Sequence, residues 1–152
     1  MKVLGIESSC DETGVALVDA DGAAAPRLLA HAAGAACLAW ALHLEGAAPA
    51  TTIAAFLLAL VLVNAWNFMD GINGLAASQA LLCATGFAVV LGDGWRLLAL
   101  VLAAACLGFL PFNFPRARVF LGDVGSGALG YLVAALLAAG FAARPMAWWP
   151  LL

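Results

Sequence analysis

The sequence predicts an all-α, polytopic membrane helix bundle that is preceded by a short β-hairpin. Of its 152 residues, 66% are hydrophobic and only 10% are charged, and the mean hydropathy is +1.06. Soluble domains average about half apolar and about a quarter charged residues. The apolar residues occur in long runs, whereas five of the nine acidic residues lie within the first 21 positions. We therefore expect the body of the chain to lie in a lipid bilayer and its beginning to be different.

The first 22 residues, MKVLGIESSCDETGVALVDADG, alternate in strand fashion on both sides of a polar stretch at residues 7–14. This pattern is typical of a β-hairpin. A hairpin of this length is only marginally stable by itself in water. The segment is also too acidic, and its apolar part too short, for a signal peptide.

Five apolar segments follow, and each is expected to be a membrane span. They cover residues 28–44, 51–66, 75–91, 97–112 and 128–143, with an apolar stub at residues 146–152. Each segment holds 16 or 17 residues, whereas about 20 are needed to cross a hydrocarbon core of about 30 Å. Flanking residues are therefore expected to complete each span. Alanine, glycine and leucine dominate, and small residues allow close helix packing in lipid.

The connections between these segments predict which polar residues share a face of the membrane. Residues 70–74 and residues 113–127 are separated by two crossings, so both connections face the same side. The second connection contains Arg116 and Arg118 close to a span, which favours a cytoplasmic position. Arg96 and Arg144 fall on the opposite side and weaken this argument.

The two connections on this face hold an unusual density of polar groups. The first lies within the stretch NAWNFMDGINGL, and the second leads into FLGDVGSGALG. The candidate site residues are Asn64, Asn67, Asp70, Asn73, Asp123 and Ser126. Oxygen atoms are the ligands that Mg²⁺ takes, often together with substrate phosphates. A helical turn would place Asn67 and Asp70 on one face, and the glycine-rich start of the last segment could meet a phosphate.

Each candidate also has a structural interpretation that the sequence leaves open. Asp70 and Asn73 could be turn and helix-cap residues, and Asp123 could be the N-cap of the last span. Arg116 and Arg118 could be anchors at the membrane surface. The four cysteines show no CxxC spacing, so neither a zinc site nor a disulfide framework is indicated. No basic patch of the kind that binds nucleic acid is present.

Two stretches, NAWNFMDGINGLAASQA and LGFLPFNFPRARVFLGDVGSGALGYLVA, resemble the central motifs of the polyprenyl-phosphate N-acetylhexosamine-1-phosphate transferases. This is the family of the undecaprenyl-phosphate GlcNAc-1-phosphate and phospho-MurNAc-pentapeptide transferases, and the resemblance covers about residues 31–152. It implies a multi-pass enzyme of the cell inner membrane, with its active-site loops cytoplasmic, for cell-envelope glycan synthesis. Such an enzyme moves a sugar 1-phosphate from a UDP-N-acetylhexosamine to undecaprenyl or another polyprenyl phosphate. UMP is released, and Mg²⁺ is the cofactor.

The resemblance also implies roles for single residues. By motif position, Asn67 and Asp123 resemble the metal ligands, and Asp70 and Asn73 resemble catalytic positions near the pyrophosphate or sugar. The substrate-binding positions expected are Asn64, Arg116, Arg118 and Ser126. Position 73 departs from the family's common DGxDG, because it holds asparagine where the second aspartate is usual.

The beginning of the chain resembles a different family. Residues 1–32 are similar to the first hairpin of the tRNA adenosine threonylcarbamoyltransferases, which begin VLGIE(S/T)SCDET. The two resemblances meet at RLLAHA without a linker, which indicates a joined reading frame. We predict a hairpin fragment over residues 1–30 and a truncated transferase domain over residues 31–152.

The sequence contains neither the Asp-Asp motif nor the basic, histidine-bearing loop that the resemblance implies for a complete site. We therefore expect residues 1–152 alone to lack transferase activity. Two alternative interpretations are a fragment of a tRNA-modifying enzyme and a membrane remnant without enzymatic activity.

Overall fold

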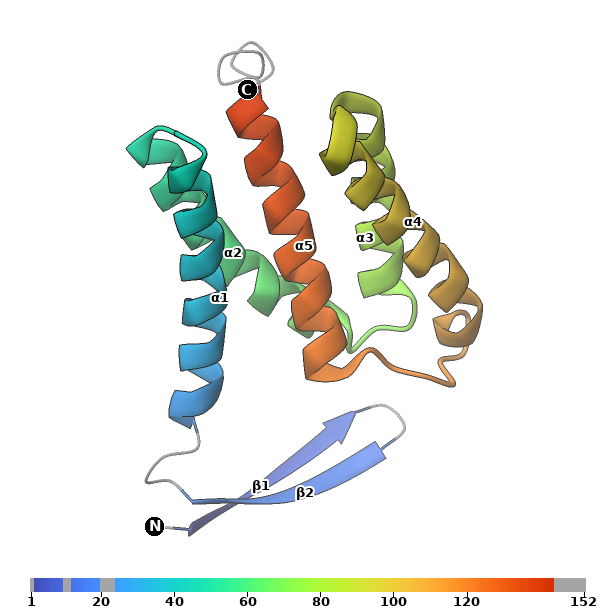
Figure 1. Ribbon diagram of the computed structural model, residues 1–152. Coiled ribbons are helices and arrows are strands. Elements are labelled where there is room, and N and C mark those ends of the chain that lie inside the picture. The colour runs from blue at the N-terminus through green and yellow to red at the C-terminus, as the bar shows by residue number, and fades with distance from the viewer. Residues whose placement is uncertain (1, 10–11, 20–23, 144–152) are drawn as a thin grey trace.

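The computed structural model describes residues 2–9, 12–19 and 24–143 (Figure 1). Its elements are β1 (Lys2–Ser9), β2 (Glu12–Asp19), α1 (Ala24–Leu44), α2 (Pro49–Met69), α3 (Leu75–Val90), α4 (Asp93–Asn113) and α5 (Gly122–Ala143). The predicted stub at residues 146–152 lies outside the described residues.

The strands β1 and β2 pair antiparallel, with Lys2 opposite Asp19 and Ser9 opposite Glu12. Within the described part of the chain, the two strands contact each other and none of the helices. The helices therefore form the bundle without using the strands.

Four of the five helices are longer than the apolar segments that predicted them. The helices α1, α2 and α4 have 21 residues and α5 has 22, whereas α3 has 16. Residues beside the apolar runs thus continue these four helices, as expected, because a helix satisfies its own backbone hydrogen bonds whether its end residues are apolar or polar. An apolar run marks the hydrocarbon part of a helix and does not define its ends.

Three of the described helices are long and apolar enough to cross a membrane: Pro49–Met69, Gly94–Asn113 and Gly122–Ala142. Two further apolar helices are shorter than these three. They are Ala30–Leu44, which is part of α1, and α3. This composition is that of a multi-pass membrane helix bundle. The count of five spans stays a prediction.

The helix α5 lies in the middle of the bundle (Figure 1). It packs against α2 on one side and α3 on the other, α1 packs against α2, and α4 pairs with α3. The apolar part of α5 is 56% buried, compared with 22% for α2 and for α4. Large apolar side chains of α2 and α4 are exposed, among them Leu57, Val61, Leu97 and Leu107. Such continuous apolar surfaces are suited to contact with lipid chains.

Among the described glycines, Gly130 of α5 lies nearest to the backbone of another helix. A Cβ atom at this position would lie 2.5 Å from the carbonyl oxygen of Leu62 and 2.8 Å from the Cα of Val63, both in α2. Further along α5, the fully buried Ala134 continues the row of small residues. Lipid removes the hydrophobic drive between helices, so close van der Waals contact between small residues holds them together. The pairing of α2 with α5 therefore depends on a glycine at position 130.

We expect Gly130→Ala to separate α2 from α5 and to lower the free energy of unfolding by about 1–3 kcal/mol, the usual cost of overpacking. The apparent Tm in detergent measures this loss. The matched control is Gly108→Ala in α4, where an added Cβ meets no atom within 4 Å. Equal Tm values for the two variants would contradict the close-packing argument.

Candidate functional site

The end of α2 and the beginning of α5 meet at one end of the bundle (Figure 1). The backbone N–H of Gly122 donates to Oδ2 of Asp70 at 2.9 Å. The side-chain Nδ2 of Asn67 donates to Oδ1 of Asp123 at 3.1 Å. The two polar motifs thus form one cluster at this end of the bundle. That both loops face the same side of the membrane stays a prediction.

The orientation of the Asn67 amide is set by two acceptors on α5. Its Nδ2 donates to Oδ1 of Asp123 and, at 3.2 Å, to Oγ of Ser126. Ser126 is fully buried, and its Oγ donates to the carbonyl oxygen of Gly122 at 2.8 Å. Because both amide hydrogens of Asn67 face α5, the remaining polar atom of the amide is Oδ1. An amide oxygen is a suitable ligand for Mg²⁺.

Asp70 is the C-cap of α2 and has αR geometry. The carbonyl groups at a helix C-terminus disfavour a carboxylate, whereas the N–H groups at a helix N-terminus favour one. Asp70 meets both, because the N–H of Gly122 at the start of α5 donates to it. The other oxygen, Oδ1, is buried and has no hydrogen-bond partner among the described residues.

Three effects act on the pKa of Asp70. Burial raises the pKa, hydrogen bonds from the backbone amides of Gly122 and Leu121 lower it, and the negative charge of Asp123 raises it. The net shift is upward from the ordinary value of 3.8. A cation bound between the two carboxylates would oppose both raising effects.

Asp123 lies in the first turn of α5, one residue inside the helix start at Gly122. The positive φ of +64° at Gly122 allows the chain to turn into the helix at this point. A carboxylate in the first turn is stabilised by the helix dipole. The structure thus gives Asp123 a helix-end role and also a contact with Asn67.

A second set of contacts joins the two loops. The Nδ2 of Asn73 donates to the carbonyl oxygen of Pro115 at 3.3 Å. Asn113, which is only 2% exposed, accepts the N–H of Gly74 at 2.8 Å and donates to the carbonyl oxygen of Val119 at 2.9 Å. The sequence analysis did not select Asn113. The available signal was a carboxamide in FNF, directly after an apolar run.

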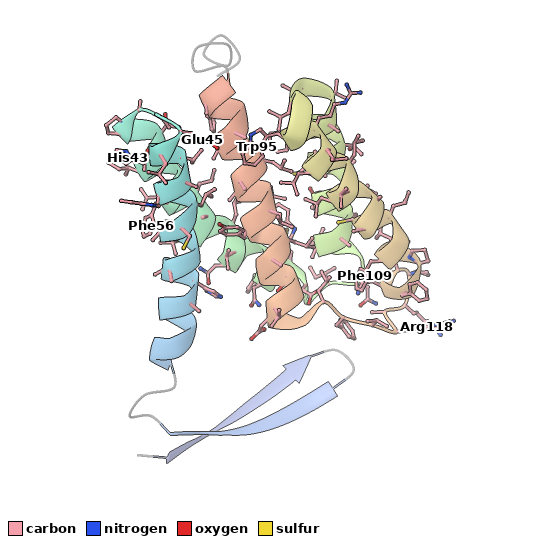
Figure 2. The ribbon with its side chains drawn as sticks, viewed as in Figure 1. His43, Glu45, Phe56, Trp95, Phe109 and Arg118 are labelled. Atoms are coloured by element: carbon pink, nitrogen blue, oxygen red, sulfur yellow. The ribbon has the colours of Figure 1, made fainter. Side chains whose placement is uncertain are left out.

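Three predicted substrate-binding residues are not drawn into this cluster. Asn64 is exposed, and its Nδ2 donates to the carbonyl oxygen of Leu60 in its own helix at 2.8 Å. Arg116 and Arg118 are exposed on the loop after α4. Arg118 extends outward, away from the start of α5 (Figure 2). The assignment of these residues to substrate binding stays a prediction.

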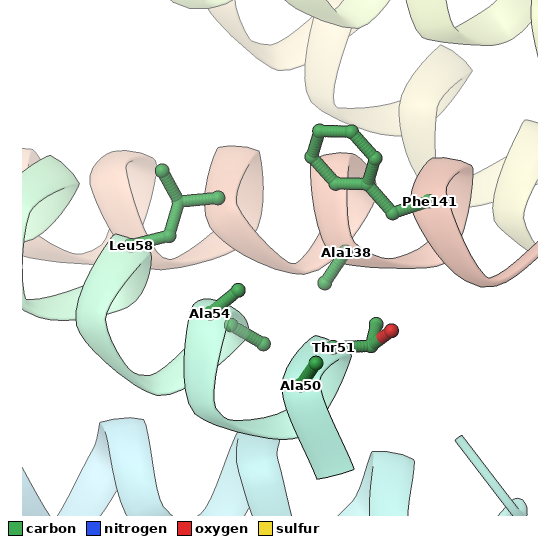
Figure 3. A pocket seen from close by; sticks show the side chains of 7 residues that line it. Ala50, Thr51, Ala54, Leu58, Ala138 and Phe141 are labelled. Carbon is green, nitrogen blue, oxygen red and sulfur yellow. The ribbon is translucent and has the colours of Figure 1, made fainter. Parts of the chain in front are cut away.

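The described residues line two apolar cavities, and one of them adjoins the site. One of about 270 Å³ lies between the first half of α2 and the last half of α5, and Figure 3 shows Ala54, Leu58 and Phe141 around it. It is far along α2 from Asn67 and offers no charged group, so we do not include it in the site. The second, of about 200 Å³, is lined by α3, α4 and α5 and includes Phe109 and Leu121. Leu121 directly precedes Gly122, so this second cavity adjoins the polar cluster.

The residues present fit a hard divalent cation. Among the described residues no group of three or more His, Cys, Asp and Glu side chains could hold a metal ion. The candidate ligands are a mixed set of two carboxylates, Asp70 and Asp123, and one amide, Asn67. Mg²⁺ is commonly bound by one or two carboxylates, with waters and substrate phosphates completing the coordination. The buried Oδ1 of Asp70 is an acceptor of the right chemistry for such an ion.

The fold and the cluster define a multi-pass membrane protein with an acidic, amide-rich site at one end of its bundle. Residues 23–140 match glycosyl transferase family 4, and the chain belongs to this family. The match begins at residue 23, before the boundary at residue 31 that the motifs predict, so the exact boundary stays a prediction.

Several curated relatives are similar over about half of the chain. A decaprenyl-phosphate N-acetylglucosaminephosphotransferase of Mycobacterium tuberculosis is 46% identical over 90 residues, 51% of this chain and 22% of that protein. A phospho-N-acetylmuramoyl-pentapeptide-transferase of Moorella thermoacetica is 49% identical over 80 residues, 50% of this chain and 25% of that protein. A probable undecaprenyl-phosphate N-acetylglucosaminyl 1-phosphate transferase of Bacillus subtilis is 40% identical over 79 residues, 49% of this chain and 22% of that protein.

The matched part of the chain spans about a quarter of the length of these relatives. No solved structure matches the chain.

The raised pKa of Asp70 has a consequence for stability. The folded state binds a proton at Asp70 more tightly than the unfolded state does. Protonation of Asp70 therefore stabilises the fold below pH 3.8, and this stabilisation is lost as the pH rises through the pKa of the folded state. We expect Asp70→Asn, which keeps an acceptor for Gly122, to raise the apparent Tm at pH 7 in buffer with EDTA. The difference from the unchanged protein should vanish below about pH 3.8. A variant that is less stable than the unchanged protein at pH 7 would contradict this sign.

Proposed function

We propose that this chain provides the catalytic core of a transferase that moves N-acetylhexosamine 1-phosphate from a UDP-sugar to polyprenyl phosphate and releases UMP. The supporting observation is the meeting of Asn67 and Asp70 with Gly122 and Asp123 across the contact of α2 with α5. Membership of glycosyl transferase family 4 supports the same reaction class. The names of the relatives support a polyprenyl-phosphate acceptor and an N-acetylated amino sugar.

In this reaction an oxygen of the lipid phosphate attacks the phosphorus that bears the sugar. A new phosphorus–oxygen bond forms, the bond from this phosphorus to the bridging oxygen breaks, and UMP leaves with the electron pair. The product is a lipid-linked sugar pyrophosphate. Catalysis of such a transfer consists mainly of positioning and charge neutralisation.

We propose Mg²⁺ as the cofactor, with Asn67, Asp70 and Asp123 as the residues that would hold it. When bound, the ion would supply positive charge to the pyrophosphate oxygens. Ser126 keeps the Asn67 amide in one orientation through the hydrogen bond at 3.2 Å. Asp70, which accepts the N–H of Gly122 in the same cluster, is proposed to act as a catalytic residue near the pyrophosphate. Asn73 lies on the same loop and is proposed to contact the sugar or pyrophosphate.

The surroundings of the cluster suit a substrate with a polar head and an apolar chain. The cavity of about 200 Å³ beside Leu121 is apolar and opens between helices that expose large apolar side chains. We propose that the first isoprene units of the lipid lie there while the phosphate reaches the polar cluster. Arg116 and Arg118, on the neighbouring loop, are proposed to attract phosphate groups. The proposed location is the inner membrane, with both loops on the cytoplasmic side.

We expect Asp123→Ala to lower Mg²⁺-dependent transfer by about 100-fold or more, because it removes a carboxylate that would hold the ion whose positive charge stabilises the transition state. The assay measures UMP release from UDP-GlcNAc or UDP-GalNAc with polyprenyl phosphate. It uses a chimaera in which the matched segment of this chain replaces its counterpart in the Mycobacterium tuberculosis relative.

The control for this assay is Thr85→Ala, which removes hydrogen bonds from Oγ1 to the carbonyl oxygens of Leu81 and Leu82 within α3. This variant should retain activity. Near-normal transfer by Asp123→Ala would assign Asp123 to a helix-end role alone. The same assay on residues 1–152 checks the expectation that they are inactive by themselves.

Topology gives an independent test of the proposed location. Ile72 and Val119 are exposed residues on the two loops. In a cysteine-free background, we expect Ile72→Cys and Val119→Cys to react with a membrane-impermeant maleimide from the cytoplasmic side only. Reaction of both from the opposite side would reverse the proposed orientation, and reaction of one from each side would contradict the shared site.

A further inference from the structure

Asn113 is one of two buried polar side chains among the described residues, the other being Ser126. It is the last residue of α4 and does not belong to the cluster formed by α2 and α5. A buried carboxamide is costly unless its hydrogen bonds are made. The hydrogen bonds of Asn113 therefore indicate the role of this buried side chain.

Both ends of the Asn113 side chain bind backbone groups of the site loops. Oδ1 accepts the N–H of Gly74 at 2.8 Å, and Nδ2 donates to the carbonyl oxygen of Val119 at 2.9 Å. Gly74 lies four residues after Asp70, and Val119 lies four residues before Asp123. One side chain thus connects the loop that holds the first carboxylate to the loop that leads to the second.

Packing at Gly74 supports this connection independently. Gly74 has a positive φ of +74°, and a Cβ there would lie 2.9 Å from Cδ2 of Phe114. Only glycine fits a backbone with this φ so close to the ring. The Nδ2 of Asn73 adds a hydrogen bond to the carbonyl oxygen of Pro115 at 3.3 Å. The two loops are therefore in direct contact around Asn113.

We propose that Asn113 is a positioning residue that fixes the loop of Asp70 relative to the loop that enters α5. Its significance for catalysis rests on the proposed function, whereas the connection itself does not. The side chain is buried and acts through its hydrogen bonds to Gly74 and Val119. Its loss would let the two carboxylates change their separation while the helices stay folded.

The first measurement is amide hydrogen exchange of the whole chain in nanodiscs. Asn113→Ala removes the side-chain oxygen that accepts the Gly74 N–H, so exchange at Gly74 should become about tenfold faster. The amide of Ser78, which donates to the carbonyl oxygen of Gly74 at 2.9 Å, serves as an internal reference and should not change. Unchanged exchange at Gly74 would overturn the proposal.

The second measurement is the distance between spin labels on Ile72→Cys and Val124→Cys, two exposed positions beside the carboxylates. The distribution should be narrow in the otherwise unchanged protein and broad in Asn113→Ala. Thr85→Ala, which loses side-chain hydrogen bonds inside α3 only, should keep the narrow distribution. An equally narrow distribution in Asn113→Ala would also overturn the proposal.

Asn113→Asp covers the case in which the alanine variant does not fold. Its ionised carboxylate still accepts the Gly74 N–H but cannot donate to the carbonyl oxygen of Val119. Exchange at Gly74 should remain slow while the label distribution broadens. A narrow distribution with slow exchange would show that the donor half of the connection has no positioning role.

The chimaera distinguishes this proposal from the proposed function. Asn113→Ala should lower kcat about tenfold or more while the KM for the UDP-sugar stays nearly constant, since the groups that contact substrate remain. A parallel loss of folded protein and activity, with constant kcat per folded molecule, would indicate a purely structural role. If the chimaera is inactive with Asn113 present, the proposed function fails, and the exchange and label results still decide the connection.

Discussion

The contact between α2 and α5 determines the rest of this structure. Gly130 allows α5 to approach the backbone of α2, with a Cβ position only 2.5 Å from the carbonyl oxygen of Leu62. Asp123 lies seven residues earlier on α5, which corresponds to about 10 Å at 1.5 Å per residue. Over so short a length a helix is rigid. The close contact therefore fixes where the start of α5 meets Asn67 and Asp70.

The same contact creates an electrostatic compromise at Asp70. A carboxylate at the C-terminus of α2 is disfavoured by the helix carbonyls and by burial. The N–H of Gly122 offsets part of this cost, but Asp123 adds a second negative charge. A carboxylate with a perturbed pKa and a charged neighbour is a candidate for a functional site, which supports the role proposed for Asp70.

Several features of this arrangement were predictable from the sequence. Two predicted crossings between residues 70–74 and 113–127 placed both connections on one side, and the spacing of Asn67 and Asp70 predicted that both would lie on one face of a helical turn. In the structure both residues contact the start of α5. The helix ends were not predictable from the apolar runs, because polar residues at Gly122–Gly127 continue the helical hydrogen bonding of α5. The direction of the Arg118 side chain was not predictable either, since an exposed loop residue follows no periodic pattern.

Asn113 shows why a pattern of side chains gives an incomplete account of such a site. Its partners are the backbone groups of Gly74 and Val119, and backbone groups are the same at every position of a sequence. The two predicted crossings require only that the α3 and α4 pair returns the chain to the same face. It does not determine the lateral position of the returning loop. That position depends on contacts between loops, so the α3 and α4 pair serves the site as a support, although the carboxylates themselves lie at the ends of α2 and α5.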